Sequence, residues 1–418
     1  MPSSISKFFL ILLFLSLIFL FYLQFSSEKF LIYNLNFKTN SSIQYNFTTP
    51  EANSGSFGPK SNGTDFFSII DFPYSKLPSM SQPHNGPIHM REFCHLSFDC
   101  VVYSDLDRNL PLDQLNNFSA LIAAGPARRK IEPLMKKIGI NLAERSRTQF
   151  WITSDRESAI NPGNGNHLTP YLNRAFNWSA TYGNNVTFFS GMSDVEKLRK
   201  PIAKREIEKI VRSEFAKKTK LVCWIMSNCA FSWTNRLKLV SDLVQSLPEK
   251  LNFWGRGENC LRNVKDNITF HGKLPGTQFD LNGVIKDCVF YLAFENSNCS
   301  HYITEKFSNA LNGYAIPIVN GWRESYVQRL AGSFIHVKDF SDMKELSDYL
   351  LYLKGNFEAY LEYHNWRQNF QFAADPTKSL HCRICERLKK EKEEGYKNEY
   401  QISDLRKFFR NYQTCKQD

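Results

Sequence analysis

Three features are missing from this 418-residue sequence, and each absence narrows the kind of protein it encodes. No segment repeats another with a fixed period, so the chain shows no sign of a repeat array. Cys382 and Cys385 form a Cys-x-x-Cys, but no second pair with zinc-like spacing and suitable histidines accompanies it, which argues against a zinc site. Charge is absent from the apolar run at residues 8–25, and no clear small-x-small cleavage site follows it. An uncleaved membrane anchor is therefore favoured over the alternative, a secretory signal peptide.

The first 90 residues predict three segments. Residues 1–7 are expected to be a cytoplasmic tail, residues 8–25 a transmembrane signal anchor and residues 26–90 a stem. The stem is rich in Ser, Asn, Gly, Pro and Thr, so it can bury little core and is predicted to be flexible. The expected topology is a single-pass type II membrane protein, with its amino end in the cytosol and its bulk in a lumen.

Cysteines and glycosylation motifs agree with a lumenal location. All ten cysteines lie beyond the predicted anchor, and an oxidising lumen favours disulfides between them. Only lumenal Asn-x-Ser/Thr motifs can be glycosylated, and their number here argues against a cytosolic domain. They occur at Asn40, Asn46, Asn62, Asn117, Asn177, Asn185, Asn267 and Asn298.

Residues 288–321 predict a strand, a polar loop, a helix and a second strand. An apolar run at residues 289–294 has strand length, residues 304–311 favour a helix, and residues 315–319 form the next buried strand. The loop therefore lies at the carboxyl end of a parallel strand, where open sheets bind ligands.

Lys306 falls in the first turn of that helix, where free N–H groups and the helix dipole already favour an anion such as a diphosphate. Glu305 beside it can accept hydrogen bonds from ribose or sugar hydroxyls. The alternative is an ordinary capped helix with a surface Glu and Lys.

The segment FENSNCSHYITEKF, followed by NALNGYAIPIVNG, closely resembles the donor-site signature of the α-1,3-fucosyltransferases that use GDP-fucose, glycosyltransferase family 10. One departure lies inside the match, because the family usually has Asp where this chain has His301. The resemblance covers roughly residues 94–385.

Two further blocks resemble the same family. In QFWITSDRESAINP, residues 149–162, Glu157 matches the general base, although beside Arg156 it is equally read as a surface ion pair. In FNWSATYGNNVTFFSG, residues 176–191, Tyr182 is kept, but Gly183 replaces an arginine and Asn184 begins a pair that replaces charged residues.

The resemblance implies a GT-B-like α/β fold of two facing doubly wound βαβ domains. Its domains would be residues 91–200 on the acceptor side and residues 201–385 for GDP-fucose, with a tail at residues 386–418. It also implies that the opening Cys94 and Cys100 pair with the closing Cys382 and Cys385, and Cys223 with Cys288. The donor-binding residues it implies are Tyr182, Ser227, Asn228, Arg236, Tyr291, Asn296, Tyr302, Glu305 and Lys306.

Patterning predicts several other elements independently. Strands are expected at residues 98–103, 120–124, 150–153, 221–226, 252–255 and 268–271, and helices at residues 127–139 and 235–247. Residues 342–369 read as helical and are expected to pack back across the domains. The basic stretch at residues 197–220 contributes to the net charge of +11 and reads as a solvated interdomain helix rather than a nucleic-acid site. Asp105 and Asp107 form an Asp-x-Asp that is expected to be a turn rather than a metal site.

The implied function is transfer of L-fucose, with inversion, from GDP-fucose to a GlcNAc hydroxyl, expected to be O3, on glycoprotein or glycolipid glycans in the Golgi. GDP-fucose would be a co-substrate, no cofactor would be required, and a divalent metal is not expected to be essential. No nucleic-acid partner is expected, and a homodimer through anchor and stem stays open. Two alternatives remain: a catalytically silent lumenal glycan-binding or scaffold homologue, favoured by Gly183 and His301, and a transferase with an altered acceptor.

Overall fold

The computed structural model describes residues 65–72, 88–104, 118–124, 146–160, 172–183, 185–191, 195–226, 232–255, 258–272, 278–372, 376–396 and 402–416. All of them belong to one compact unit, which spans residues 57–418. Several predictions lie outside the described residues: the cytoplasmic tail at 1–7, the anchor at 8–25, the Asp105 and Asp107 pair, the helix at 127–139, Asn184, and Ser227 with Asn228. Among the helices that are described, none combines the length and apolar character needed to cross a membrane.

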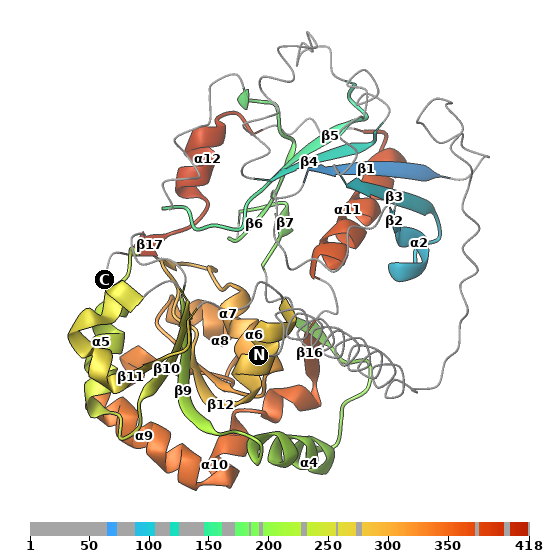
Figure 1. Ribbon diagram of the computed structural model, residues 1–418. Coiled ribbons are helices and arrows are strands. Elements are labelled where there is room, and N and C mark those ends of the chain that lie inside the picture. The colour runs from blue at the N-terminus through green and yellow to red at the C-terminus, as the bar shows by residue number, and fades with distance from the viewer. Residues whose placement is uncertain are drawn as a thin grey trace, which may run out of the picture. The chain divides into compact units, whose positions relative to one another are not determined.

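The first sheet has the strand order β2-β3-β1-β4-β5-β6-β7 (Figure 1). Its strands are β1 (Phe66–Phe72), β2 (Ile88–His89), β3 (Asp99–Ser104), β4 (Ala120–Ala124), β5 (Phe150–Ser154), β6 (Trp178–Thr181) and β7 (Phe188–Phe189). All neighbours pair in parallel except β2, which runs antiparallel to β3 at the edge and leads into the short helix α2 (Met90–Phe93).

The prediction of a flexible stem over residues 26–90 is wrong for residues 66–72, which form β1. This strand lies between β3 and β4, and Phe67, Ile69 and Ile70 are buried. The stem prediction rested on average composition, whereas FFSIIDF is a short apolar run that pairs with strands far along the chain. The folded region therefore begins before residue 66.

Two helices from the carboxyl end cover opposite faces of the first sheet. Side chains alternate along its strands, so each face has its own core. The face that includes Ile122 and Ile152 packs against α11 (Pro376–Glu393), and the face that includes Trp151 packs against α12 (Leu405–Asn411). The predicted tail at residues 386–418 is therefore wrong for these helices, because their apolar sides complete the core of the first sheet.

Disulfides hold α11 in place. Cys94 bonds to Cys382 and Cys100 to Cys385, which confirms the predicted pairing of the opening and closing cysteines. His381 also lies 2.9 Å from the Oδ2 of Asp71 on β1. The first α/β half is therefore assembled from the two ends of the described chain.

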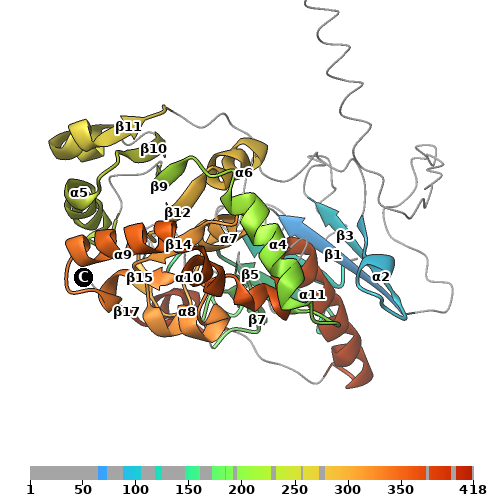
Figure 2. The ribbon, with the colours of Figure 1, turned by 90° about the horizontal axis from the view of Figure 1, so that it is seen from below.

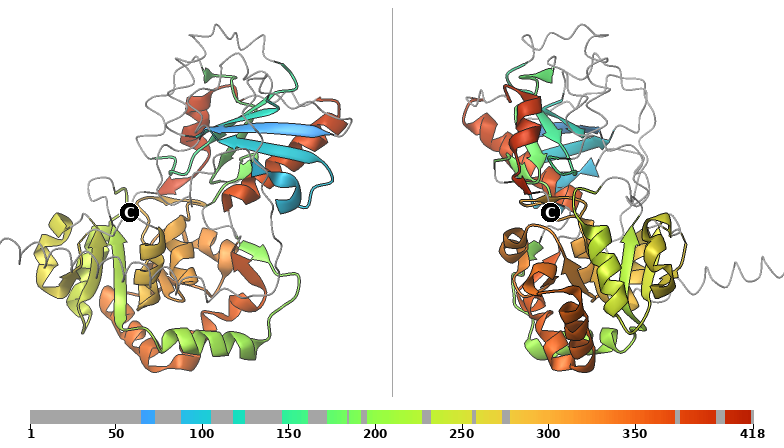
Figure 3. Two further views of the ribbon diagram at one scale, coloured as in Figure 1. Left: turned by 45° about the vertical axis from the view of Figure 1, so that its right-hand side comes forward. Right: turned by 90° about the vertical axis from the view of Figure 1, so that its left-hand side faces the viewer.

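The second sheet is parallel throughout, with the order β11-β10-β9-β12-β14-β15. Its strands are β9 (Lys220–Met226), β10 (Leu251–Gly255), β11 (Ile268–Phe270), β12 (Cys288–Leu292), β14 (Ile316–Val319) and β15 (Ile335–His336). One face packs against α5 (Arg236–Ser246) and α9 (Met343–Gly355), and the other against α6 (Gln278–Lys286), α7 (Glu305–Asn312) and α8 (Arg323–Leu330). Figures 2 and 3 show these helices around the strands. The doubly wound prediction for this half is confirmed, as is the disulfide between Cys223 and Cys288, which joins β9 to β12.

The predicted helical stretch at residues 342–369 is divided by caps. Asp342 accepts a hydrogen bond from the Glu345 N–H and starts α9, and Asn356 accepts from the Ala359 N–H and starts α10 (Phe357–Glu362). A 3₁₀ helix, η6 (Asn365–Gln368), follows. The stretch packs into the core of the second sheet, so the expectation that it crosses back to the first half is wrong; α11 makes that crossing.

The predicted basic helix is α4 (Lys204–Phe215), which follows the first sheet along the chain and packs against the core of the second sheet rather than between the two sheets. It buries Ile207 and Val211 and exposes most of its charged residues, as the solvated-helix prediction requires. Before it, β8 (Val195–Lys197) pairs with β16 (Phe370–Phe372). Among the remaining described elements, η4 (Glu258–Asn267) and η5 (Val337–Asp339) are 3₁₀ helices, and β13 (Asn298–Cys299) pairs with β17 (Cys415–Lys416).

Candidate active site

The loop after β12 is built around a buried carboxylate, Glu295. Its side chain is fully shielded from solvent and lies 3.0 Å from the Nζ of Lys306. The backbone N–H and the hydroxyl of Thr304 each donate to Glu295 at 2.8 Å. Glu295 therefore ties the end of β12 to the start of α7, which begins at Glu305.

Lys306 has a partner for each of its three ammonium protons. Besides Glu295, the ammonium donates to the Thr304 hydroxyl at 2.8 Å and to the Glu305 carboxylate at 3.3 Å. The Glu305 side chain is 42% exposed, which makes it the contact that an incoming anion can displace most easily.

Burial and charge act against each other in this cluster. Burial raises the pKa of Glu295, although Lys306 and Thr304 oppose the shift. Burial alone would lower the pKa of Lys306, but the charges of Glu295 and Glu305 outweigh it and the pKa lies above its ordinary value. Burial likewise works to raise the pKa of Glu305, and Lys306 brings it below the ordinary value. The lysine stays charged, and a negative charge remains beside it.

A second cation faces the same loop. Arg236 is the first residue of α5, and its side chain is 4% exposed. Burial lowers its pKa, and the charge of Glu295 works in the opposite direction. The chain just before α5 is fastened to the loop, since the Trp233 N–H donates to the Asn296 carbonyl at 2.7 Å and the Thr234 hydroxyl to the Glu295 carbonyl at 3.0 Å. The structure thus brings Arg236, Asn296, Glu305 and Lys306 together.

Glu157, from the first sheet, meets this loop. It follows β5, and its carboxylate accepts a hydrogen bond of 3.4 Å from the Tyr302 hydroxyl. Next to it, the Ser158 hydroxyl donates to the Ser297 hydroxyl at 2.7 Å. The carboxylate predicted as general base and the loop predicted to bind the donor are therefore neighbours.

Three of the predicted donor-binding residues, Tyr182, Tyr291 and Tyr302, are buried in the cores. Tyr182 is 0% exposed, and its ring packs edge-on against Tyr302 at 5.1 Å. Tyr291 is 2% exposed and packs with α7 on one face of the second sheet. Burial raises the pKa of the Tyr182 and Tyr291 phenols. Neither of these two rings is open to a ligand in this structure, so Tyr182 supports the site through Tyr302.

The structure shows the local surroundings of two departures from the family pattern, His301 and Gly183. His301 has a positive φ of 62°, and its N–H donates to the Ser325 hydroxyl at 2.7 Å. Its side chain lines a cavity of about 270 Å³ together with Arg329 and Phe370. Gly183 has a φ of +123°, and a Cβ there would lie 2.5 Å from the carbonyl oxygen of Tyr412.

Sequence reasoning missed Glu295 and the carboxyl-terminal residues that reach Glu157. Glu295 stands inside the quoted FENS, but nothing in the spacing showed that it would be buried against Lys306. Tyr412 lies in the predicted tail, yet its hydroxyl donates to the Glu157 carbonyl at 2.7 Å. The sequence did offer one signal that this segment is folded: Tyr412 and Cys415 follow an apolar helix pattern at residues 405–411.

These observations define a class: an α/β protein with two mainly parallel sheets, in which a carboxylate from one sheet faces a loop of the other. That loop is accompanied by a buried arginine and a partly buried lysine. Residues 215–407 match the family model described as "Glycosyltransferase family 10 (fucosyltransferase) C-term". This part of the chain is therefore similar to glycosyltransferase family 10, in line with the resemblance seen in the sequence.

Curated relatives carry corresponding names. The chain is 34% identical over 246 residues to "Glycoprotein 3-alpha-L-fucosyltransferase A" of Drosophila melanogaster, covering 58% of this chain and 44% of that protein. It is 35% identical over 204 residues to "4-galactosyl-N-acetylglucosaminide 3-alpha-L-fucosyltransferase 9" of Mus musculus, covering 47% and 50%. The chain thus spans about half the length of these relatives. A crystal structure of an alpha1,3-fucosyltransferase with GDP-fucose aligns with 84% of this chain and 96% of its own at 14% identity and a TM-score of 0.44.

Proposed function

We propose that this protein transfers L-fucose from GDP-fucose to a GlcNAc hydroxyl, O3, of a glycoprotein or glycolipid glycan. The observation that carries the proposal is the position of Glu157, within hydrogen-bond reach of Tyr302 in the family's signature loop. The family match over residues 215–407 and the names of the curated relatives support the donor and the linkage.

In the proposed reaction, Glu157 accepts the proton of the acceptor hydroxyl while that oxygen forms a bond to the anomeric carbon of fucose. The bond from this carbon to the phosphate oxygen breaks, and its electron pair leaves with GDP. Attack from the face opposite GDP inverts the anomeric centre, so no protein nucleophile is needed.

The chain's own cations would stabilise the departing diphosphate. Arg236 and Lys306 lie at the starts of α5 and α7, and their charges oppose the negative charge that grows on the leaving group. Glu295 keeps Lys306 charged and fixed in direction. These two cations are proposed to replace the divalent metal that other transferases use.

The location we propose is the Golgi membrane, with the catalytic part in the lumen. Four described disulfides and the many sequons support an oxidising, glycosylating compartment.

The decisive experiment incubates the full chain, purified in detergent, with GDP-fucose on a glycan array. We expect fucose on acceptors with terminal or internal GlcNAc, undiminished by a chelator, and at least hundredfold slower transfer by Glu157→Gln. A fragment starting after residue 86 is unsuitable because it lacks β1. GDP-fucose binding without transfer to any acceptor would favour the silent homologue, and strict dependence on a divalent ion would contradict the proposed role of the two cations.

A further inference from the structure

The last described segment of the chain, residues 402–416, runs from one half of the molecule to the other; we call it the carboxyl-terminal strap. At its start, Ile402, Leu405 and Phe409 are buried in the core that includes Trp151 of the first sheet. Asp404 caps α12 by accepting from the Lys407 N–H at 2.8 Å. The strap's first half is therefore fixed on the first sheet.

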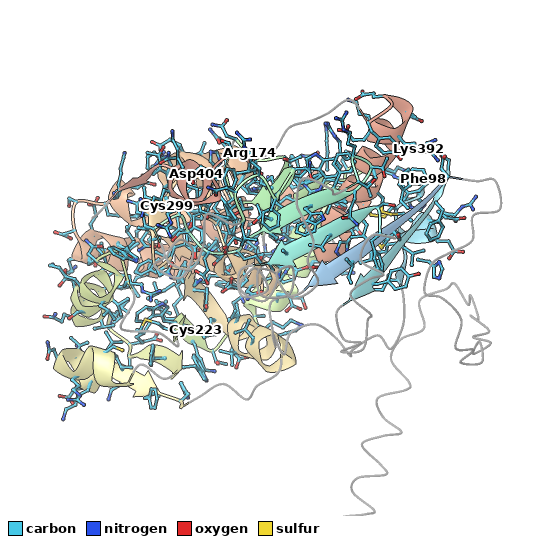
Figure 4. The ribbon with its side chains drawn as sticks, turned by 90° about the horizontal axis from the view of Figure 1, so that it is seen from above. Phe98, Arg174, Cys223, Cys299, Lys392 and Asp404 are labelled. Atoms are coloured by element: carbon cyan, nitrogen blue, oxygen red, sulfur yellow. A yellow bond between two sulfur atoms is a disulfide. The ribbon has the colours of Figure 1, made fainter. Side chains whose placement is uncertain are left out.

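The end of the strap is fixed on the loop between β12 and α7, residues 293–304, which we call the signature loop. Cys415 bonds to Cys299, and β17 pairs antiparallel with β13 (Figure 4 labels Cys299 and Asp404). The Ser300 N–H donates to the Thr414 carbonyl at 2.8 Å, and the Gln413 amide donates to the Ser300 carbonyl at 3.0 Å. These contacts lie two residues before Tyr302, the partner of Glu157.

Between these anchors, the strap contacts the Glu157 loop directly. The Tyr412 hydroxyl donates to the Glu157 carbonyl at 2.7 Å. One residue later, the Gln413 side chain accepts from the Ala159 N–H at 2.9 Å. Gly183 leaves room for this arrangement, since a Cβ there would lie 2.5 Å from the Tyr412 carbonyl oxygen. The strap's backbone thus occupies the space that a side chain at residue 183 would need.

We propose that the strap sets the position of Glu157 relative to Tyr302, with Tyr412 as a positioning residue and the bond between Cys299 and Cys415 as its anchor. The proposal rests on the proposed function, in which Glu157 is the base. A base must stay within hydrogen-bond reach of the proton it removes, and a misplacement of about 1 Å can slow a reaction on the order of a hundredfold. Because the strap binds the Glu157 loop and the signature loop together, it fixes the distance between base and donor.

Tyr412→Phe in the full chain removes only the hydroxyl. We expect kcat to fall about ten- to hundredfold, with the KM for GDP-fucose and the Kd for GDP unchanged, because the Tyr412 hydroxyl holds the Glu157 loop, whereas Glu295 and Glu305 hold Lys306. Tyr363→Phe is the matched control: it removes a hydroxyl bonded to Tyr349 at 2.9 Å, remote from the site, and should leave kcat unchanged. Equal kcat for Tyr412→Phe and the unmodified chain would overturn the proposal.

Hydrogen exchange gives a readout that does not depend on activity. In a double variant, Cys299→Ser with Cys415→Ser, peptides covering residues 155–160 and residues 298–302 should both exchange faster, with protection of β9 unchanged. Unchanged exchange in both peptides would contradict the strap's role even if the protein transferred no fucose. Loss of transfer in Glu157→Gln alone, with full activity in Tyr412→Phe, would leave the proposed function intact and remove the strap from it.

Discussion

At the residue scale, the site depends on a carboxylate without solvent contact. Glu295 accepts from Thr304 and from Lys306, so the lysine that was expected to stand ready for phosphate is already held by the protein. Removing one member of a buried ion pair leaves the other without compensation, which is costly. The cluster Glu295, Thr304, Glu305 and Lys306 therefore has to be judged as a unit, with Glu305 as its exposed and replaceable member.

Replacing Lys306 with Met tests whether this unit binds the diphosphate. The substitution removes the charge and keeps the length of the side chain, so we expect GDP to bind ten- to hundredfold more weakly, about 1.5 to 3 kcal/mol. Calorimetric titration with GDP and with GDP-fucose should show the same loss, since both carry two phosphates. Lys238→Met is the control, because that lysine is 73% exposed on α5 and pairs only locally with Asp242. Unchanged GDP affinity in a folded Lys306→Met variant would contradict a phosphate role for α7.

At the scale of elements, the sequence pattern predicted the strands and helices whose formation depends on neighbouring residues. The strand expected at residues 120–124 is β4 with the same bounds, and the helix expected at 304–311 is α7 shifted by one residue. Strand β4 is marked by an unbroken apolar run, and helix α7 is marked by helix-favouring residues and by the stop at Gly313. The strand β1 was missed because its partners β3 and β4 lie far along the chain, and composition averaged over the surrounding polar residues hid its seven-residue length.

For the same reason, the sequence did not predict which distant elements pack against one another. The apolar side of a helix shows that it is buried, but it does not show which sheet it covers. The start of α11 was therefore assigned to the second domain, and the rest of α11 and all of α12 were assigned to a tail. The family resemblance supplied the disulfides to Cys382 and Cys385, whereas the bond between Cys299 and Cys415 was left unassigned and is found in the structure. Glu157 was predicted from the family motif; its contact with Tyr412 depends on a packing arrangement that no motif describes.

The close contact between the Tyr412 backbone and Gly183 predicts that a side chain at residue 183 destabilises the packing of the strap. Gly183→Ala has to place a Cβ 2.5 Å from a backbone carbonyl oxygen at a φ of +123°. We expect a loss of unfolding free energy of about 1 to 3 kcal/mol, seen as a lower melting temperature. Gly355→Ala, at the end of α9 in open space, is the matched control and should be neutral or slightly stabilising. Similar melting temperatures for the two variants would show that the strap does not press on Gly183.

At the scale of the whole molecule, the described ends of the chain are joined through charge as well as through cores. Asp65, just before β1, pairs with Lys389 and Lys392 of α11. Hydrogen bonds from Lys389 and then from Lys392 lower the pKa of Asp65 from 3.8 to about 2. A carboxyl with a depressed folded-state pKa stabilises the fold above its unfolded pKa, and the contribution disappears as pH falls through the folded one.

Asp65→Asn should therefore melt below the unmodified chain at neutral pH, and the gap should narrow as pH falls from about 4 to about 2. Melting curves at a series of pH values and low ionic strength measure this directly, since salt screens the pair. A gap that stays constant down to pH 2 would show that the pairing of Asp65 with α11 does not contribute.

The disulfides between Cys94 and Cys382 and between Cys100 and Cys385 also constrain the order in which the protein is made. The partners are separated by 288 and 285 residues. Ribosomes add about 5 to 20 residues per second, so Cys100 waits on the order of 15 to 60 s for its partner to be synthesised. During that interval the first sheet lacks both α11 and α12, so neither of its apolar faces has its covering helix on the nascent chain. The second sheet has its helices α4 to α10 before α11 is synthesised, so the half of the molecule that is made first is completed last.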